Sequence, residues 1–354
     1  MCWSGTTRRR ASAASCRRAF RSDRIRSGRL RPAAPLPAVL AGPARRIIHC
    51  TGIPAVTPST SKVGSIADAV SLIPDGTRLA IGGFAIYQHP MAVVRALIRA
   101  GRRDLTVVGT VSGNEVDLLA GAGCLKRVET SYVGLEKYGL APNFRRAVEE
   151  GRIEVVDYPE VLSFDRFRAS QENLTFWPCD YLGGTDVLAR NPDIRIFTCP
   201  ITGRSLQAVP PADPEVVVLH AIAADERGNV ILPRRHLLPQ GLDVIMARGC
   251  DTVIVTVEKI VPRALVRRHA EQVQIPAYKT KLVVEAPWGA HPTAVLGRYA
   301  TDDAHFRDYV AASASPEGFA AYLDRYVHAP ADHAAYLERI GAERLGTLTE
   351  LDTL

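Results

Sequence analysis

The sequence is poor in aromatic residues and has no long apolar run. Phe, Trp and Tyr make up only 6% of the 354 residues, whereas Val, Ile, Leu and Ala are plentiful. This mix suits buried parallel strands covered by Ala-rich helices. No stretch approaches the roughly 18 consecutive apolar residues that a membrane-spanning helix needs. We therefore expect an α/β protein with no membrane partner.

The seven cysteines form no C-x-x-C pair and show no His/Cys spacing typical of a metal site. Their number is odd, and four of them lie inside otherwise globular sequence. Buried thiols of a reducing compartment are the favoured interpretation. We accordingly expect no metal site and a cytoplasmic location.

Positive charge is concentrated at the N-terminus. Residues 1–61 carry twelve arginines and a single acid, Asp23, which gives a net charge of +11, while the rest carries 32 basic and 36 acidic residues, a net −4. The folded part is therefore mildly acidic, although the whole chain is formally +7. This distribution argues against nucleic acid as a partner.

Residues 1–61 show no helical or strand periodicity and are rich in Arg, Ala, Ser and Pro. Such a composition buries too little apolar surface to offset chain entropy, so we expect a disordered extension. It resembles an organellar transit peptide, and Arg17-Arg18 faintly resembles a twin-arginine signal whose apolar region is broken by further arginines. It is also typical of translation from a mis-assigned start in a GC-rich bacterial genome, the interpretation we favour.

Regular patterning begins at Val63. The spacing predicts a helix over Ser65–Ile73, a strand over Leu79–Ile81, a helix from Pro90 to Gly101 and a strand over Leu105–Val111. Strand, helix and strand within about 35 residues form a βαβ unit, which requires a right-handed crossover and a parallel sheet.

Similar segments continue to the C-terminus. The pattern predicts further strands over Ile153–Val156, Ile194–Thr198, Val216–Ala223, Thr252–Val257 and Leu282–Glu285, and helices over Pro142–Glu150, Phe164–Gln171 and Gly241–Arg248. Residues 302–341 are helical in pattern. We predict one domain over residues 62–354: an open, doubly wound, mostly parallel α/β sheet with a helical C-terminal appendage.

Gly82-Gly83-Phe84 follows the first predicted strand directly and precedes a helix. Open parallel sheets bind ligands at the carboxyl ends of their strands, and free N–H groups of a glycine turn can bind a phosphate or an oxyanion. By itself, a Gly-Gly after a strand is better explained as a plain tight turn.

The longer segment Asp75–Pro90 resembles the first signature of the family I coenzyme A transferases. In that signature Asp-Gly precedes the strand, and Gly-Gly-Phe and a downstream Pro recur. Gln88 departs from the pattern, because a Gly is usual there, so we expect a less open loop. The resemblance assigns Gly82, Gly83 and Phe84 to binding of the coenzyme A thioester.

The resemblance continues over most of the chain, from about Lys62 to Leu351. The chain is similar to the A (or α) subunit of the family, in the branch of glutaconate CoA-transferase. The matching segments are Gly121–Cys124, Phe144–Gly151, Phe176–Pro178, Val217–Ala221, Asp225–Asn229, Thr256–Val261 and Ala286–Pro292.

The resemblance implies that this chain is half of an enzyme. In these transferases a glutamate of the second (B) subunit, within Ser-Glu-Asn-Gly, attacks the thioester. This chain lacks that motif; Ser112–Glu115 has similar letters in another order, and Glu115 is expected to begin a helix. The implied partner is a B subunit in an α2β2 assembly. The implied substrates are an acyl-CoA and a carboxylic acid, with no permanently bound cofactor.

Glu160 opens an alternative. A related branch hydrolyses a carbon–carbon bond of coenzyme A-linked steroid-ring fragments with a glutamate of its A subunit. Glu160 follows the strand Ile153–Val156 and lies where that glutamate would be, so it is our candidate catalytic residue. The competing interpretation is a solvated loop acid.

Other polar residues are expected to be structural. Glu258 ends an apolar strand and suits an ion pair or a helix cap, with a place in the wall of the same cleft as the alternative. His291 suits a hydrogen-bonded turn, with a general base as the alternative. Asp225 suits a turn that satisfies its own backbone. A non-catalytic binding partner is a further alternative for the whole chain.

Overall fold

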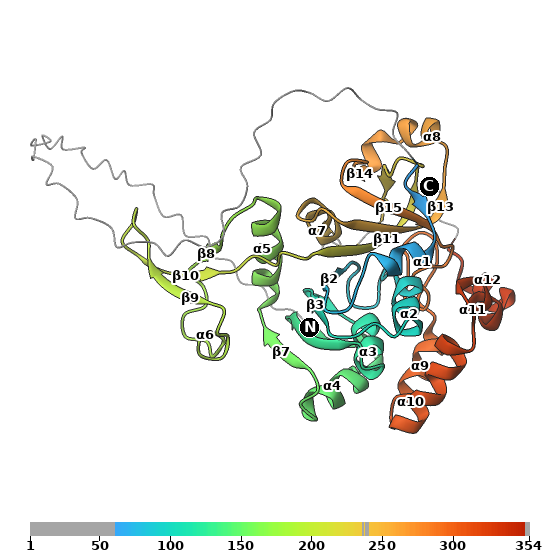
Figure 1. The fold of residues 1–354 in the computed structure, drawn as a ribbon, viewed down its shortest axis with the longest axis horizontal. Coiled ribbons are helices and arrows are strands. Elements are labelled where there is room, and N and C mark those ends of the chain that lie inside the picture. The colour runs from blue at the N-terminus through green and yellow to red at the C-terminus, as the bar shows by residue number, and fades with distance from the viewer. Residues whose placement is uncertain (1–60, 236, 238–240, 351–354) are drawn as a thin grey trace, which may run out of the picture. The chain divides into compact units, whose positions relative to one another are not determined.

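The computed structural model describes residues 61–235, 237 and 241–350 (Figure 1). The predictions made for the extension 1–61 therefore lie, apart from Ser61, outside the described residues. Among the helices of these residues, none is both long and apolar enough to cross a lipid bilayer.

A large parallel sheet forms the centre of the fold. Its strands lie in the order β1-β15-β13-β11-β2-β3-β5-β7, and every neighbouring pair along this path is parallel. The bounds are β1 (Val63–Gly64), β2 (Arg78–Ile81), β3 (Leu105–Val108), β5 (Leu125–Thr130), β7 (Glu154–Asp157), β11 (Val216–Ala224), β13 (Val253–Ile260) and β15 (Thr280–Glu285). Two short strands, β12 (Val230–Ile231) and β14 (Val273–Ile275), extend it antiparallel beyond the end of β11.

Helices pack on both faces of this sheet, because successive strand residues point to opposite sides. Leu79 and Ile81 pack in one core with α2, α3 and the C-terminal helices, whereas Ala80 packs in the other with Leu242 and Met246 of α7. The α-helices are α1 (Ile66–Ser71), α2 (Met91–Arg99), α3 (Asn114–Gly121), α4 (Pro142–Glu149), α5 (Glu160–Gln171), α6 (Val187–Arg190), α7 (Leu242–Arg248), α8 (Arg263–Arg268), α9 (Asp303–Ala312), α10 (Pro316–Leu323), α11 (His333–Ile340) and α12 (Ala342–Leu348). The predicted doubly wound α/β class is confirmed.

The C-terminal helices are joined to the sheet domain by a buried polar cluster. Asn143 of α4 donates to Asp117 of α3 at 3.0 Å, to Tyr309 of α9 at 3.1 Å and to Ser313 at 3.0 Å. Aromatic rings of α9 and α10 fill the space around it, as with Tyr309 and Tyr322 at 4.9 Å. The predicted helical appendage is therefore present and packed against α3 and α4.

Several features of the fold differ from the prediction. The stretch predicted as a strand over Ile194–Thr198 forms β9 (Arg195–Thr198), which lies outside the main sheet in a small antiparallel one. Its companions are β8 (Trp177–Cys179) and β10 (Ser205–Val209). Helix α5 begins at Glu160 and not at Phe164, so Glu160 is a helical residue. A further two-stranded sheet pairs β4 (Val111–Ser112) with β6 (Tyr132–Val133).

Candidate active site

The loop after β2 lies at the centre of the sheet, between β11 and β3. The N–H groups of Gly82, Gly83 and Phe84 are used inside the chain. Gly82 donates to the Val218 carbonyl at 2.8 Å, Gly83 to Oδ1 of Asp243 at 2.9 Å and Phe84 to the Tyr87 carbonyl at 2.9 Å. The prediction that this turn presents free backbone donors is therefore wrong for the chain by itself. Whether Gly82, Gly83 and Phe84 contact coenzyme A stays a prediction.

Both glycines are required by close packing. Gly83 has φ +96°, and a Cβ there would lie 2.5 Å from the Tyr87 carbonyl and 2.7 Å from the His89 ring. A Cβ on Gly82 would lie 2.3 Å from Leu219. The Gly-Gly pair thus lets the loop fold back tightly onto β11 and α7.

Gln88 occupies the position where the family usually has Gly, and its backbone conformation explains the preference for Gly. Its φ of 61° is in the left-handed region, which favours glycine. The side chain is 2% exposed, and its amide donates to the His220 carbonyl at 2.9 Å. Gln88 therefore fills the space between the loop and β11.

Two buried polar side chains, His89 and Glu115, lie next to the loop. The ring nitrogens of His89 lie 2.8 Å from the Gly82 carbonyl and 2.9 Å from the Ala85 carbonyl, and Nε2 is 3.2 Å from Glu115. Glu115 also accepts the Gly113 N–H at 3.0 Å and is 1% exposed. As predicted, Glu115 begins a helix; its carboxylate is closed to a substrate.

Glu258, near the end of β13, and His220, in the middle of β11, form a second buried group. The carboxylate lies 2.7 Å from Nε2 of His220 and accepts the Tyr299 hydroxyl at 2.9 Å and the Trp288 N–H at 2.9 Å. Burial raises the pKa of Glu258, but His220 and the other donors outweigh it and leave the pKa below its usual value. Glu258 is therefore hydrogen-bonded within the chain, with His220 as a nearby basic partner.

The structure does not bring Glu160 to this loop. Glu160 is the first residue of α5, three residues after the end of the edge strand β7, and its side chain is exposed. Strands β3 and β5 intervene between β2 and β7, a separation of about 14 Å at the usual strand spacing. Its carboxylate is open to a partner or a substrate at that edge.

The other two predicted structural residues are as expected. His291 is 1% exposed and lies 2.7 Å from the Tyr336 hydroxyl and 3.0 Å from Asp302. Asp225 accepts the N–H groups of Arg227 and Asn229, at 3.0 and 2.9 Å.

His291, Asp302 and His305 lie close enough together to hold a metal ion, with candidate ligand atoms within 4.8 Å of one another. However, Arg344 donates to both carboxylate oxygens of Asp302 at 2.7 Å. A guanidinium in that position opposes a second cation, so this cluster is better described as a hydrogen-bonded core.

Asp243 gives the loop a testable dependence on pH. The side chain is fully buried, and burial raises its pKa to about 6, with only partial compensation from the Gly83 N–H and the charge of His89. A carboxyl group whose pKa is raised on folding contributes stability below its unfolded pKa of 3.8, and that contribution is lost as the pH rises through about 6. We expect Asp243→Asn, which keeps an acceptor for Gly83, to gain about 2–3 kcal/mol relative to the wild type between pH 4 and 7.

Urea unfolding of both proteins across this range checks the prediction. Contributions of other carboxyl groups are common to both and cancel in the difference. Parallel stability curves for the two proteins would show that Asp243 titrates normally.

Comparison with known proteins identifies the family. The family model described as Coenzyme A transferase matches residues 63–286. The chain is 33% identical to an uncharacterized protein of Archaeoglobus fulgidus over 83% of this chain and 65% of that protein, so it spans a little under two thirds of that relative. It is 31% identical to the A subunit of 3-oxoadipate CoA-transferase of Pseudomonas knackmussii, over 76% of this chain and 94% of the relative.

Two further matches cover nearly all of the protein compared. One is the cholesterol ring-cleaving hydrolase IpdA subunit of Mycobacterium tuberculosis, 28% identical over 79% of this chain and 98% of the relative. The other is the crystal structure of glutaconate coenzyme A-transferase from Acidaminococcus fermentans, with a TM-score of 0.77 and 28% identity over 82% of this chain and 96% of that chain. The chain therefore belongs to the coenzyme A transferase family, among the homologues of the A subunits of heteromeric CoA-transferases.

Proposed function

We propose that this chain is the A subunit of a heteromeric enzyme that moves coenzyme A between an acyl-CoA and a free carboxylic acid. The proposed partner is a B subunit that supplies the glutamate nucleophile, in an α2β2 assembly. Coenzyme A enters as the thioester substrate and not as a resident cofactor. A cytoplasmic location is part of the proposal.

The observation that carries this proposal is the state of the carboxylates around the loop after β2. Glu115, Asp243 and Glu258 are all buried, and Glu115 and Glu258 each accept several hydrogen bonds. None of the three can approach a thioester carbonyl. The three carboxylates around the loop are therefore closed to a substrate. This suits an active site in which another subunit supplies the attacking carboxylate.

In the proposed reaction, the partner's glutamate attacks the thioester carbonyl and expels coenzyme A as a thiolate, leaving an acyl anhydride. The thiolate then attacks the glutamyl carbonyl of the anhydride, which gives a glutamyl-CoA thioester and releases the first acid. The acceptor acid repeats both steps in reverse. We propose that Gly82, Gly83 and Phe84 form the wall of the shared cleft against which the thioester lies.

Glu160 supports a second candidate function. It is an exposed carboxylate at the carboxyl end of β7, and the family includes the ring-cleaving hydrolase subunit to which this chain is similar. In this alternative Glu160 is the catalytic residue, the substrate is a cyclic acyl-CoA, and water is the second reactant. A chain that only binds or stabilises its partner is the remaining alternative.

A single experiment separates these functions. We expect the enzyme assembled from this chain and its B subunit to convert an acyl-CoA plus a free acid into a new acyl-CoA, as followed by mass spectrometry. Glu160→Gln should leave that rate within about twofold, because the glutamine keeps the size of the side chain and Glu160 is remote from the loop. Glu172→Gln, at the exposed C-terminal end of the same helix, is the matched control.

Two other outcomes would favour the alternative functions. Loss of activity in the Glu160 variant alone, with water and not an acid as the second substrate, would establish the hydrolase. No turnover with a wide panel of acids and acyl-CoAs would favour the non-catalytic partner.

A further inference from the structure

The side chain of His89 is enclosed by the loop that follows β2. It is 1% exposed, and its ring lies so close to Gly83 that a Cβ there would be 2.7 Å from Nδ1. Nδ1 lies 2.8 Å from the Gly82 carbonyl oxygen, and Nε2 lies 2.9 Å from the Ala85 carbonyl oxygen. The ring therefore joins the two ends of the turn formed by residues 82–85.

Both oxygens that contact the ring nitrogens of His89 are acceptors only. A carbonyl oxygen has no proton to donate, so each ring nitrogen must carry a proton to form its hydrogen bond. A neutral imidazole has one N–H, and the lone pair of its other nitrogen would face a carbonyl oxygen at 2.8 or 2.9 Å. The imidazolium has two N–H groups and satisfies both contacts.

His333, which is also buried, has the surroundings of a neutral ring. Its Nε2 lies 2.8 Å from the Pro287 carbonyl, an acceptor, whereas its Nδ1 lies 3.4 Å from the Arg95 guanidinium, which can only donate. One N–H and one lone pair therefore satisfy both neighbours. Burial, together with the charge of Arg95, lowers the pKa of His333 to about 4. The surroundings of these two buried histidines thus require different protonation states.

Two carboxylates face His89 from the helices packed around the loop. Glu115 of α3 is 1% exposed and lies 3.2 Å from Nε2. Asp243 of α7 is 1% exposed and accepts the Gly83 N–H at 2.9 Å, and the charge of His89 acts on it against the effect of burial. From the segment after β15, the neutral hydroxyl of Thr293 accepts the backbone N–H of His89 at 3.3 Å. A positive charge on the ring is therefore balanced inside the protein, as a buried charge requires.

We propose that His89 is an imidazolium and that, in this charged form, it positions the loop of residues 82–85 for the reaction. A planar trans peptide directs its C=O and N–H to opposite sides, so the bond from Nδ1 to the Gly82 carbonyl turns the Gly83 N–H toward Asp243. Ala85 has φ 56°, a conformation uncommon for a residue with a Cβ, and the bond from Nε2 holds its carbonyl there. The role in the reaction rests on the proposed function, whereas the charge of the ring does not.

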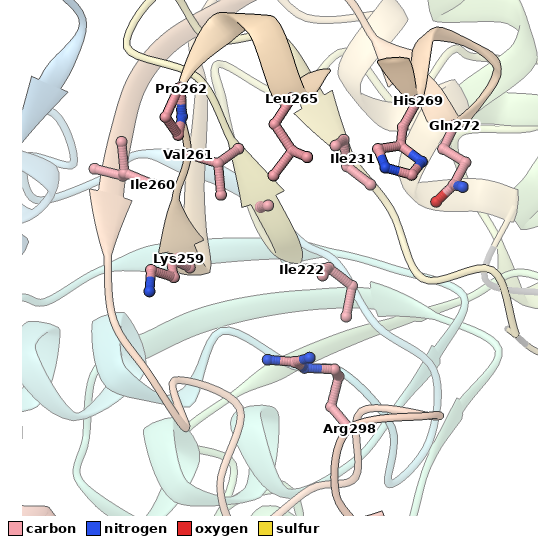
Figure 2. Close-up of a pocket in the computed structure, with 11 residues that line it drawn as sticks. Ile222, Ile231, Lys259, Ile260, Val261, Pro262, Leu265, His269, Gln272 and Arg298 are labelled. Atoms are coloured by element: carbon pink, nitrogen blue, oxygen red, sulfur yellow. The ribbon is translucent and has the colours of Figure 1, made fainter. Parts of the chain in front are cut away.

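His89 acts through the loop and does not itself contact the substrate. Its ring is buried, and the apolar pocket of about 320 Å³ beyond the ends of β11 and β13 is lined by no residue of the segment 82–89 (Figure 2). His89 is therefore a positioning residue. A displacement of about 1 Å around a reacting group can lower a rate about a hundredfold, so the position of this loop matters to the reaction.

NMR of the ring nitrogens tests the charge. In the full chain labelled with ¹⁵N-histidine, we expect both ring nitrogens of His89 to carry a proton at pH 7, but only one of those of His333. His89→Gln and His333→Gln assign the two sets of signals. Glu115→Gln, which keeps an acceptor for the Gly113 N–H, should raise the ratio of neutral to charged His89 about tenfold. A single ring proton on wild-type His89 would overturn the proposal.

The pH profile of the two-subunit enzyme tests the positioning. We expect kcat to fall as the pH rises, with the same midpoint at which NMR shows the loss of the second ring proton. His89→Gln should lower kcat at neutral pH about ten- to a hundredfold, keep KM for the acyl-CoA within about threefold and abolish this alkaline decrease. His333→Gln is the matched control and should keep the alkaline decrease at the wild-type pH.

A double variant covers the case in which His89→Gln fails to fold because Glu115 is left as an unpaired buried charge. His89→Gln combined with Glu115→Gln removes both charges and should show the same loss of kcat and of the alkaline decrease. An alkaline decrease that persists in these variants would overturn the positioning role, as would a wild-type midpoint that differs from that of the ring. If the two-subunit enzyme transfers no coenzyme A with any substrate, the proposed function fails, while the NMR measurement still decides whether His89 is charged.

Discussion

Purified without its partner, this chain is expected to transfer coenzyme A at a rate at least about a thousandfold below that of the two-subunit enzyme. Covalent transfer requires a carboxylate that reaches the thioester carbonyl, and loss of a nucleophile typically removes several orders of magnitude in rate. Among the described residues near the central loop, Glu115 is bound to the Gly113 N–H and Glu258 to three donors. Neither is free to attack.

The measurement uses this chain by itself, the B subunit by itself and an equimolar mixture, each with an acyl-CoA and a free acid. Only the mixture should form new acyl-CoA. Mass spectrometry of the mixture, stopped during turnover, should find coenzyme A attached to the B subunit, with none on this chain. Robust transfer by this chain without the B subunit, or an adduct on one of its own carboxylates, would contradict the proposal that the B subunit supplies the nucleophile.

Much of the fold follows from hydrophobic spacing, because most strands of the main sheet are apolar on both faces. Strand β11 is buried at all nine positions and β13 at six of its eight. The same spacing does not predict strand β5 (Leu125–Thr130). Its sequence, Leu-Lys-Arg-Val-Glu-Thr, has three charged residues. Its position inside the sheet becomes understandable only when the distant partners of Arg127 and Glu129 are known, among them Arg78, Arg166 and Glu154.

The site was predictable in location and much less so in detail. Gly82 and Gly83 follow a strand, which placed the loop at a ligand-binding edge. The residues that support it, His89, Glu115 and Asp243, are far apart in the chain: Asp243 bonds to a residue 160 positions away. A pattern of neighbouring residues cannot predict a contact between residues so far apart in the chain. For the same reason, the N–H groups of the loop were expected to be free, because their acceptors lie elsewhere in the chain.

Replacing Glu129 is expected to have the largest effect on stability. This carboxylate on β5 is 2% exposed and is surrounded by three guanidinium groups. Arg78 donates to both of its oxygens at 2.8 and 2.6 Å, Arg127 donates at 2.9 Å, and Arg166, itself 2% exposed, donates at 2.7 Å. Tyr158 lies against Arg166, with the guanidinium 3.7 Å from the ring centre.

Glu129→Gln should lower the free energy of unfolding by about 3 kcal/mol at pH 7, and Glu129→Ala by about 3–5 kcal/mol, because either change leaves the buried Arg166 without its anion. Burial raises the pKa of Glu129, but the hydrogen bond from Arg78 and the charges of Arg166 and Arg78 outweigh it and hold the pKa at about 2. A carboxyl group whose pKa is lowered on folding contributes stability above its unfolded value of 4.5, and loses it as the pH falls through about 2.

The difference between wild type and Glu129→Gln should therefore be constant above about pH 5 and shrink as the pH falls toward 2, as measured by urea unfolding. Glu149→Gln is the matched control. Glu149 pairs with Arg145 at 2.7 Å, but both side chains are more than half exposed, so its loss should change stability by less than about 0.5 kcal/mol. If the Glu129 and Glu149 variants lost equal stability, the three arginines would be satisfied without Glu129. The apolar residues of β5 alone would then stabilise this strand within the sheet.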